Sequence, residues 1–493
     1  MNSLLLPDLT MPVMRDYEED VLRRLRESAT RHRLIVLQAE TGAGKSIMAL
    51  DLVVRCFAKG RRALFIARGR KLVDQFSGHL RKCGVPHGIL MAGRGTLPEL
   101  VQVASKDTLT ARKNLPPSDL VIIDESHESL SRGWLAIIEH YKDATIIGLT
   151  ATPARADGRG LGRIYQDLVQ AVPPSKLIAD GWLVPTRVFA PYRPDLKGIR
   201  RGKDGDYNRD DLGKKMDRPG LIGHVVKHWK ELGQDRPTLV FGCTVEHATH
   251  MAEEFTRAGI LCRHIDADTP EDEREESLAM LMDGTIKVVT NVGVLRQGVD
   301  LPPVSCGCLV RPTKSFVLYR QMIGRLKRPF PGKNDAIVID HAGAVYNHGM
   351  PDEDVNWTLA DEESLNKRRE KERKEGKLPT PILCHNCHAM FNPASHCPHC
   401  GTPVKKQGTM PIRHRDGKLV EVNGDSGPGT HEDRQRYWHK CLAVMAYRGH
   451  SFGAASHMYR SKFGEWPRGL QNMPPIGGMQ RKVRDVYPQY VRS

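Results

Sequence analysis

Apolar and polar positions follow two repeating patterns along the first 345 residues of the chain. Short apolar runs indicate buried strands, and apolar residues that recur every three or four positions indicate helices packed against them. The strand-like runs are residues 34–37, 63–67, 101–105, 121–123 and 145–149, followed by 238–242, 262–265, 286–290, 308–310 and 336–339. Their alternation with helical segments predicts an α/β chain with two mostly parallel sheets in tandem.

Changes in composition divide the chain into five parts. We expect an α/β domain at 1–180, a second at 181–345, a charged linker at 346–380, a compact cysteine-rich segment at 381–404 and a basic helical tail at 405–493. The linker is predicted to be an exposed helix because opposite charges recur at helical spacing in residues 367–375. The tail holds 16 Lys and Arg against 7 Asp and Glu. It therefore carries more than half of the chain's formal charge of +16.

This charge predicts a polyanionic partner, although charge alone does not distinguish nucleic acid from an anionic membrane. No window holds the ~18 apolar residues that a membrane span needs. Pro7 and Asp8 interrupt the apolar N-terminus, so we expect no signal peptide. Of 11 cysteines only four are clustered, which suits a reducing compartment better than a disulfide scaffold. We therefore expect a cytoplasmic protein without a membrane segment.

A glycine-rich turn follows the first strand-like run and precedes a long helical pattern. Gly42 and Gly44 allow backbone N–H groups to point toward an anion, and the N-terminus of the next helix adds a positive dipole. Lys45 is placed to reach the β- and γ-phosphates of a nucleotide, and Ser46 to hold Mg²⁺. The alternative is a glycine turn with a chance Lys-Ser pair, which the strand–turn–helix context disfavours.

Two carboxylates, Asp124 and Glu125, follow the apolar run 121–123. Open α/β sheets bind ligands at the carboxyl ends of their strands. We expect Asp124 to hold Mg²⁺ and Glu125 to orient and deprotonate a water molecule. Such a pair is more often a solvated loop, but its position about 80 residues after a phosphate loop favours nucleotide hydrolysis.

The second α/β half has the same rhythm but no phosphate loop. A helix predicted over 314–326 carries Arg325 and Arg328 one turn apart on one face. Two such arginines are suited to reach a γ-phosphate across a cleft between domains. A solvated basic helix end explains the spacing equally well.

The cysteine-rich segment has two Cys-x-x-Cys pairs. Cys384 and Cys387 are separated by nine residues from Cys397 and Cys400. Four thiolates at this spacing predict a closed, structural Zn²⁺ site, with four free thiols as the alternative. The neighbouring side chains that could replace a thiolate as ligand are His385, His388, His396 and His399.

Two other basic features have open interpretations. Arg200 and Arg201 begin an exposed loop that is either solvated or in contact with phosphates. The aromatic residues of the tail are expected to form a small core, although some, such as Trp466, could stack on bases. A basic helical unit beside a zinc site favours a nucleic-acid grip.

Together these motifs resemble those of the superfamily-2 helicases, in order over about residues 12–345. The similar stretches are 39–46 (motif I), 124–127 (motif II), 150–152 (motif III), Gly298 with Asp300 (motif V) and Gln321 to Arg328 (motif VI). Residues 340–343 and 356–359, followed by the cysteines, are similar to helicases carried by phages and prophages.

The resemblance implies two RecA-like lobes that clamp ATP and bind single-stranded nucleic acid across their upper faces. It implies catalytic roles for Lys45, Asp124, Glu125, Arg325 and Arg328, and coupling roles for His127, Thr150 and Thr152. The implied contacts to ATP and Mg²⁺ are Arg15, Thr41, Gly42, Ala43, Gly44, Lys45, Ser46, Asp124, Gly298, Asp300 and Gln321, with Gln321 also coupling the lobes. Glu18 stands where the adenine-reading stretch usually has Gln, which leaves base selectivity open.

We therefore expect an ATP-dependent helicase or translocase in the cytoplasm of a bacterium or a phage-infected cell. Single-stranded DNA is the favoured partner, RNA stays open, and replication or recombination proteins are further candidates. One alternative is a DNA-binding recruitment protein that uses its zinc site and basic tail, with ATP only as a switch. Another is a restriction-type translocase subunit. We find no nuclease-like cluster of carboxylates and lysine outside the motor, which argues against cleavage by this chain.

Overall fold

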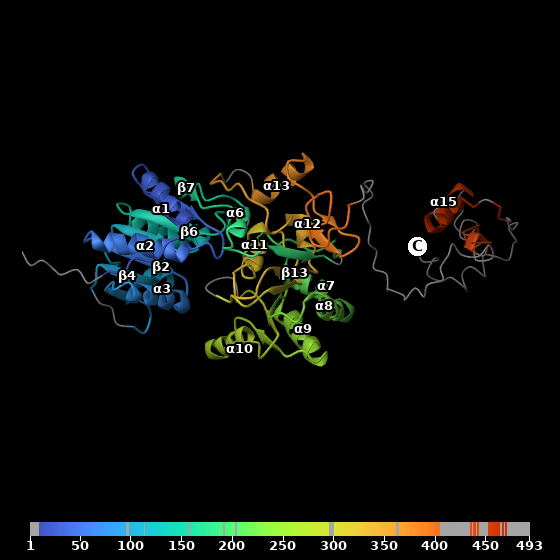
Figure 1. Cartoon of the computed structure of the whole chain (residues 1–493), viewed down its shortest axis with the longest axis horizontal. Helices are drawn as coiled ribbons and strands as arrows, with labels where there is room; N and C mark the ends of the chain where they lie inside the picture. The colour runs from blue at the N-terminus through green and yellow to red at the C-terminus, as the bar shows by residue number, and fades with distance from the viewer. Residues whose placement is uncertain are drawn as a thin grey trace, which may run out of the picture. The chain divides into compact units, whose positions relative to one another are not determined.

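The computed structural model describes residues 9–94, 98–112, 114–155, 158–190, 193–202, 205–294, 300–360 and 364–404, together with parts of 434–470. The chain divides into two compact units, Met1–Pro411 and Ile412–Ser493. The first unit holds both sheets, the first at the left of Figure 1 and the second at its centre, with helix α11 where they meet.

The first sheet has seven parallel strands in the order β3-β4-β2-β5-β6-β1-β7. Its strands are β1 Leu34–Gln38, β2 Ala63–Ala67, β3 His87–Leu90, β4 Val101–Ser105, β5 Leu120–Ile123, β6 Thr145–Thr150 and β7 Asp167–Gln170. Its helices are α1 Asp16–Ala29, α2 Lys45–Ala58, α3 Arg70–Lys82, α4 Lys106–Ala111, α5 Arg132–His140 and α6 Pro174–Ala179. Every residue of β1, β2 and β4 is buried, as expected for parallel strands covered by helices on both faces.

The second sheet has the order β10-β11-β9-β12-β13-β8-β15-β14, and its first six strands are parallel. Its strands are β8 Thr186–Phe189, β9 Thr238–Phe241, β10 Cys262–Ile265, β11 Val288–Asn291, β12 Cys306–Leu309, β13 Ala336–Asp340, β14 Ile382–Leu383 and β15 Ala389–Phe391. Its helices are α7 Arg209–Met216, α8 Pro219–Leu232, α9 Val245–Arg257, α10 Glu271–Asp283, α11 Phe316–Gly324, α12 Ala344–His348 and α13 Leu365–Lys374. The prediction of two tandem RecA-like parallel-sheet lobes is confirmed.

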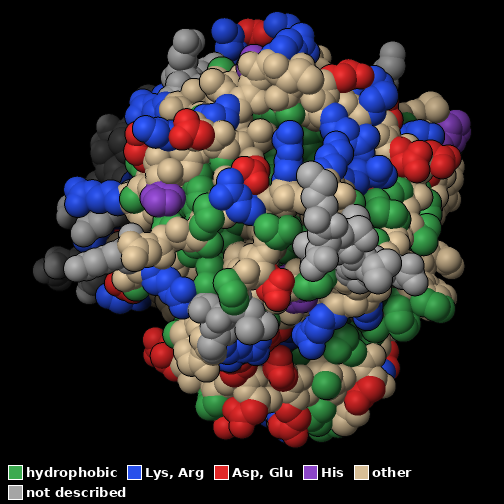
Figure 2. Space-filling model, turned by 90° about the vertical axis from the view of Figure 1, so that its left-hand side faces the viewer, with side chains coloured by type: hydrophobic (Ala, Val, Ile, Leu, Met, Phe, Trp, Pro, Cys, Tyr) green, Lys and Arg blue, Asp and Glu red, His purple; other side chains and the backbone are tan. Residues whose placement is uncertain are grey.

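Figure 2 looks onto the first lobe along the long axis of Figure 1. Lys and Arg side chains are spread over the upper part of this face, and Asp and Glu side chains gather along its lower edge. The lower edge is at the height of α10, whose first turn is acidic.

Five strands were not predicted from the sequence: β3, β7, β8 and the short pair β14 and β15. β3 and β7 form the two edges of the first sheet and are only partly buried, so their residues do not make continuous apolar runs. The third, β8, has a polar start and includes the charged Arg187.

The helix predicted over 314–326 is shorter in the structure. Helix α11 begins after Ser315, whose hydroxyl accepts a hydrogen bond from the Leu318 N–H, and ends at Gly324. The placement of Arg325 and Arg328 on one helix face is therefore wrong. After Gly324 the chain turns, with the Leu326 N–H bonded to the Ile323 carbonyl at 2.8 Å. The Lys327 carbonyl then accepts a hydrogen bond of 2.9 Å from the Val184 N–H, in the segment before β8.

The charged run of the linker, predicted to be an exposed helix, does form a helix, α13, but that helix is not fully exposed. Trp357 and Leu365 are buried in the core of the second lobe. Within the charged run, Arg369 is buried and donates a hydrogen bond of 2.6 Å to Glu353. The segment packs because its apolar positions flank the charged run and because this buried charge has a partner.

The cysteine-rich segment continues the second sheet instead of standing apart from it. β14 and β15 form an antiparallel hairpin, and Ala389 and Met390 of β15 pair with Phe189 and Val188 of β8. The hairpin thus covers a strand edge that would otherwise be open for pairing with another chain.

The second unit, Ile412–Ser493, is described in part. Trp438 and Tyr459, the latter on α15 Phe452–Phe463, are buried in a small cluster with Cys441. This confirms a core role for these aromatics. Trp466 is 38% exposed with the Arg460 guanidinium 4.5 Å from its ring, so base stacking by Trp466 stays a prediction. Among the described residues no helix has the length and apolarity required to cross a bilayer.

Candidate active site between the two lobes

The loop between β1 and α2 needs glycine at two positions. Gly42 and Gly44 have φ of +88° and +74°, in the left-handed region that favours glycine. A Cβ atom on Gly44 would lie 1.8 Å from Oε1 of Glu18. The backbone thus approaches helix α1 closely while it turns into the start of α2 at Lys45.

The side chain of Lys45, the first residue of α2, folds back into this loop. Its Nζ donates hydrogen bonds to the carbonyl oxygens of Ala39 at 2.8 Å and Glu40 at 3.2 Å. Burial lowers the pKa of Lys45, while the negative charges of Glu125, Asp124 and Glu40 oppose this shift. An ammonium group held by carbonyl oxygens inside a glycine turn fits a loop that binds a phosphate.

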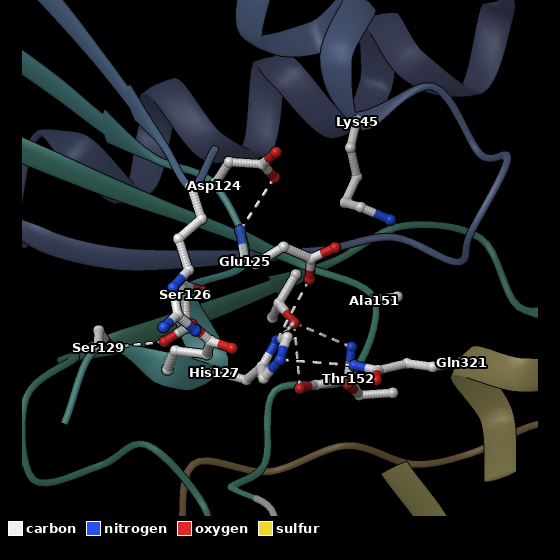
Figure 3. A network of polar contacts seen from close by, with 12 residues as sticks. Lys45, Asp124, Glu125, Ser126, His127, Ser129, Ala151, Thr152 and Gln321 are labelled. Atoms are coloured by element: carbon white, nitrogen blue, oxygen red, sulfur yellow. Dashed lines mark hydrogen bonds and ion pairs between the residues drawn. The ribbon is translucent and has the colours of Figure 1, made fainter. Parts of the chain in front are cut away.

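Asp124 and Glu125 follow β5 at the carboxyl edge of the same sheet. The Glu125 N–H donates a hydrogen bond of 2.9 Å to Oδ1 of Asp124. Burial raises the pKa of Asp124, and the charge of Glu125 adds to this effect. Glu125 itself adopts φ of +50°, a conformation that costs a non-glycine residue about 1 kcal/mol or more. Figure 3 shows Asp124, Glu125 and Lys45 around one space above the sheet.

His127 connects Glu125 to both lobes (Figure 3). Its Nδ1 lies 3.3 Å from Oε2 of Glu125 and 3.2 Å from Oγ1 of Thr150, and its Nε2 lies 3.5 Å from Nε2 of Gln321 on α11. Burial lowers the pKa of His127, but the hydrogen bond and charge of Glu125 outweigh this and the net shift is upward. The Thr150 hydroxyl donates a hydrogen bond to the Thr152 carbonyl and accepts one from the Thr152 N–H, each at 3.1 Å. A continuous polar chain therefore runs from the carboxylates to the second lobe.

These interactions set the state of Glu125. Burial alone raises its pKa, but the hydrogen bond and charge of His127, with the charges of Lys45 and Arg325, bring the pKa below its ordinary value. Glu125 is therefore held ionised, which is the form that accepts a proton.

Arg325 and Arg328 reach this site from the second lobe. Arg325 is buried, which lowers its pKa, and the charges of Glu125 and Asp124 oppose this effect. A Cβ atom on Gly42 would lie 3.3 Å from Cγ of Arg328. Arg328 also forms an ion pair with Asp300. Both arginines thus lie on the side of the second lobe that faces the phosphate loop.

Two contacts between the lobes were not anticipated from the sequence. Nη2 of Arg320 lies 2.7 Å from Oε1 of Glu40, and both residues are buried. A Cβ atom on Gly324 would lie 2.9 Å from Cβ of Thr41. The one available signal was an arginine within the otherwise apolar start of α11.

The other predicted site residues are placed as follows. Ala43 is buried and Ser46 is exposed in the phosphate loop. Arg15 lies at the start of α1 with its guanidinium 4.0 Å from the ring of Trp182, and its N–H donates to Glu18 at 2.9 Å. Burial raises the pKa of Glu18. Gly298 lies outside the described residues.

The four cysteines of the 381–404 segment come together. Their sulfur atoms all lie within 4.8 Å of one another, with 3.6 Å between Cys384 and Cys400 and 3.7 Å between Cys387 and Cys397. Four thiolates around Zn²⁺ at ~2.3 Å place the sulfurs ~3.8 Å apart. The cluster therefore fits a tetrahedral Zn²⁺ ion, and all four cysteines are free of disulfide bonds.

Two protein families match the two lobes. Residues 11–155 match the family described as "Type III restriction enzyme, res subunit", and residues 221–329 match "Helicase conserved C-terminal domain". These matches cover the phosphate loop and Asp124 in one lobe and Arg325 and Arg328 in the other. The chain belongs to superfamily 2 of the helicases.

The relatives of this helicase include phage proteins. A "51.5 kDa protein" of a Lactococcus phage (isolate 7-9) is 29% identical over 369 residues, which are 74% of this chain and 77% of that protein. A Saccharomyces cerevisiae protein assigned as the ATP-dependent helicase IRC3 is 28% identical over 68% of this chain, and this chain spans about half (52%) of it.

A more distant relative is a translocase, and a solved structure shares the fold. The DNA 3'-5' translocase XPB2 of Sulfurisphaera tokodaii is 23% identical over 64% of this chain and 78% of its own length. A fragment assigned to the HsdR subunit of a Vibrio vulnificus type I restriction enzyme has the same fold, with a TM-score of 0.56, 22% identity and coverage of 71% and 68% of the two chains. This helicase is an ATP hydrolase.

Proposed function

We propose that the chain is a motor that couples ATP hydrolysis between its two lobes to movement along single-stranded nucleic acid, preferentially DNA. The observation that carries this proposal is the position of Arg325. This residue of the second lobe is buried, and the charges of Glu125 and Asp124 in the first lobe act on its pKa. A nucleotide at the loop of the first lobe would be sensed by a side chain of the second lobe, so hydrolysis and lobe movement become linked.

Each side chain has a defined part in this proposal. Lys45 would leave the loop carbonyls to bind the β- and γ-phosphates, and Asp124 with Ser46 would hold Mg²⁺, which supplies charge neutralisation when bound. Glu125 orients the attacking water and accepts its proton. Arg325 and Arg328 stabilise the charge that develops on the γ-phosphate. His127 and Gln321 transmit the presence of the γ-phosphate between the lobes.

Hydrolysis rates with and without single-stranded DNA test this proposal. We expect DNA to stimulate ATP hydrolysis and the Glu125→Gln variant to lose that activity. The matched control is Glu139→Gln, because Glu139 is an exposed carboxylate of the same lobe. A wild-type rate that does not respond to DNA would favour the alternative of a recruitment protein that uses ATP only as a switch.

A restriction-type translocase subunit is the second candidate. The EcoAI endonuclease subunit of an Escherichia coli type I restriction enzyme is 26% identical over 59% of this chain, although this chain covers 41% of it. A translocase that tracks duplex DNA without separating its strands can be distinguished from a helicase by experiment. Displacement of a third strand from a triplex, without release of a strand from a forked duplex, would favour this candidate.

The zinc site and the location of the protein complete the proposal. Cys384, Cys387, Cys397 and Cys400 are proposed to hold one structural Zn²⁺. Such a site needs reduced thiols, and the cytoplasm of a bacterium or a phage-infected cell supplies them. The division at about residue 180 between the lobes is proposed as the domain boundary.

A further inference from the structure

Besides the site between the lobes, the second lobe has a hollow of its own, away from the phosphate loop. Its volume is about 530 Å³, and it is lined by Arg201 and residues 205–207, by residues 313–315 before α11 with Phe316 at its start, and by residues of α12 and α13. Most of these residues lie outside the two family matches, which end at residues 155 and 329. The hollow is therefore built largely by residues outside both family matches.

The lining is strongly basic, with six Lys and Arg against two Asp and Glu. Both acidic groups already have partners. Asp206 accepts hydrogen bonds of 2.6 Å from Oγ1 of Thr313 and from the Lys314 N–H. Glu370 lies 2.7 Å from Nζ of Lys374. Two of the arginines, Arg369 and Arg373, pair with Glu353 behind the hollow.

The other four basic residues of the lining are Arg193, Arg201, Lys314 and Lys367. Arg193 donates to the Asn347 side-chain oxygen at 3.0 Å, and Arg201 donates to the Gly205 carbonyl at 2.9 Å. Both acceptor groups are neutral. Nζ of Lys314 lies 4.7 Å from the ring of Tyr207. Within the described residues no carboxylate lies at ion-pair distance from these three or from Lys367. Uncompensated charge in a concave site fits a polyanion.

The hollow also lies along a route from the cleft between the lobes. That cleft is lined by Lys71 of the first lobe and Gly293 of the second. Gly293 also lines a neighbouring hollow together with Arg311, and Arg311 lies 3.9 Å from Asp206 at the wall of the basic hollow. β11, β9 and β12 are adjacent parallel strands, so their carboxyl ends place these three spaces in a row on one edge of the sheet.

We propose that this basic hollow binds the phosphate backbone of the nucleic-acid strand where the strand leaves the cleft between the lobes. The proposal rests on the proposed function, because it assigns the continuation of the strand that the motor holds. Lys314 and Lys367 are exposed side chains that contact phosphates there, and Arg193 and Arg201 line the same path. The hollow thus lengthens the footprint of the helicase beyond the two matched families.

The salt dependence of binding tests this assignment. Binding of a fluorescent oligo-dT of ~20 nucleotides is followed by anisotropy, because each phosphate contact on a single strand adds ~0.7 to the slope of log K against log salt. We expect the Lys314→Gln/Lys367→Gln variant to lower the slope by ~1.4 and the single Lys367→Gln variant by ~0.7. The Lys314→Arg/Lys367→Arg variant should restore the wild-type slope.

The control is Lys227→Gln/Lys230→Gln, which removes two exposed charges from α8, outside the lining of the hollow. An unchanged slope in the Lys314→Gln/Lys367→Gln variant would overturn the proposal. So would competition at Lys314 and Lys367 by inorganic phosphate alone, since a free phosphate compound would then be the ligand. If DNA binds with the predicted slopes but does not stimulate hydrolysis, the proposed motor function fails while this assignment stands.

Discussion

The guanidinium of Arg320 donates a hydrogen bond of 2.7 Å to the carboxylate of Glu40, and both groups are buried between the lobes. Glu40 belongs to the phosphate loop and Arg320 to α11. The helix that leads to Arg325 is therefore fixed against the loop that contains Lys45. Any movement of one lobe relative to the other at this point must therefore break or shift the Arg320–Glu40 pair.

Removing one partner of this pair should weaken the closed arrangement of the lobes. An unpaired buried charge costs about 3–5 kcal/mol, and here the cost falls on the contact between the lobes. We expect Arg320→Gln to reduce DNA-stimulated hydrolysis at least tenfold, and Glu40→Gln/Arg320→Gln to recover part of it. Steady-state rates measure this, with Arg23→Gln on the exposed surface of α1 as control. Wild-type rates in Arg320→Gln would contradict this role.

The close approach of Gly324 to Thr41 makes a second prediction. A Cβ atom at position 324 would lie 2.9 Å from Cβ of Thr41, so Gly324→Ala should separate the lobes although alanine favours a helix. We expect slower hydrolysis with an unchanged melting temperature of each lobe. The matched control is Gly78→Ala on α3, where a Cβ meets no heavy atom within 4 Å. Equal activity of the two variants would show that this contact is unimportant.

Residues 357–360 cross back from the second lobe to the first. The Gly160 N–H donates to the Ala360 carbonyl at 3.1 Å, and the Gly162 N–H donates to the Leu359 carbonyl at 2.8 Å. A Cβ on Gly160 would lie 2.3 Å from two backbone carbonyl oxygens. We expect Gly160→Ala to destabilise the chain by about 1–3 kcal/mol.

Thermal unfolding and limited proteolysis within 357–360 would measure this effect. The control, Gly223→Ala on α8, adds a Cβ that meets no heavy atom within 4 Å. If the variants at 160 and 223 melt alike and resist protease equally, the crossing segment contributes no stability.

The zinc site should stabilise the edge of the second sheet. Cys397 is buried in the cluster beside β15, and β15 covers β8. We expect one Zn²⁺ per chain on metal analysis, and Cys397→Ser or a chelator to remove it and lower the melting temperature. Cys262→Ser, which changes a thiol outside the cluster, should keep the metal. A zinc-free protein that melts as the wild type would exclude a structural role.

The sequence predicted most reliably those features that depend on residues adjacent in the chain, such as burial of a whole strand or a tight glycine turn. Continuous apolar runs located the central strands, and the turn at Gly42 to Lys45 located the phosphate loop. It did not reveal edge strands such as β3, because half-buried strands mix polar and apolar residues. It also did not reveal the Arg320–Glu40 pair, since the two residues are 280 positions apart and only folding brings them together. The charges around Arg369 suggested solvation, yet Glu353 satisfies that arginine in the core.

The central claim is that an arginine of the second lobe completes the site of hydrolysis built on the first. The most direct test is the DNA-stimulated kcat of Arg325→Gln, with ATP affinity measured separately and folding checked by thermal unfolding. If Arg325 acts as an arginine finger, kcat should fall about a thousandfold or more, and ATP affinity should change much less. A folded Arg325→Gln protein that hydrolyses ATP at the wild-type rate would contradict the account.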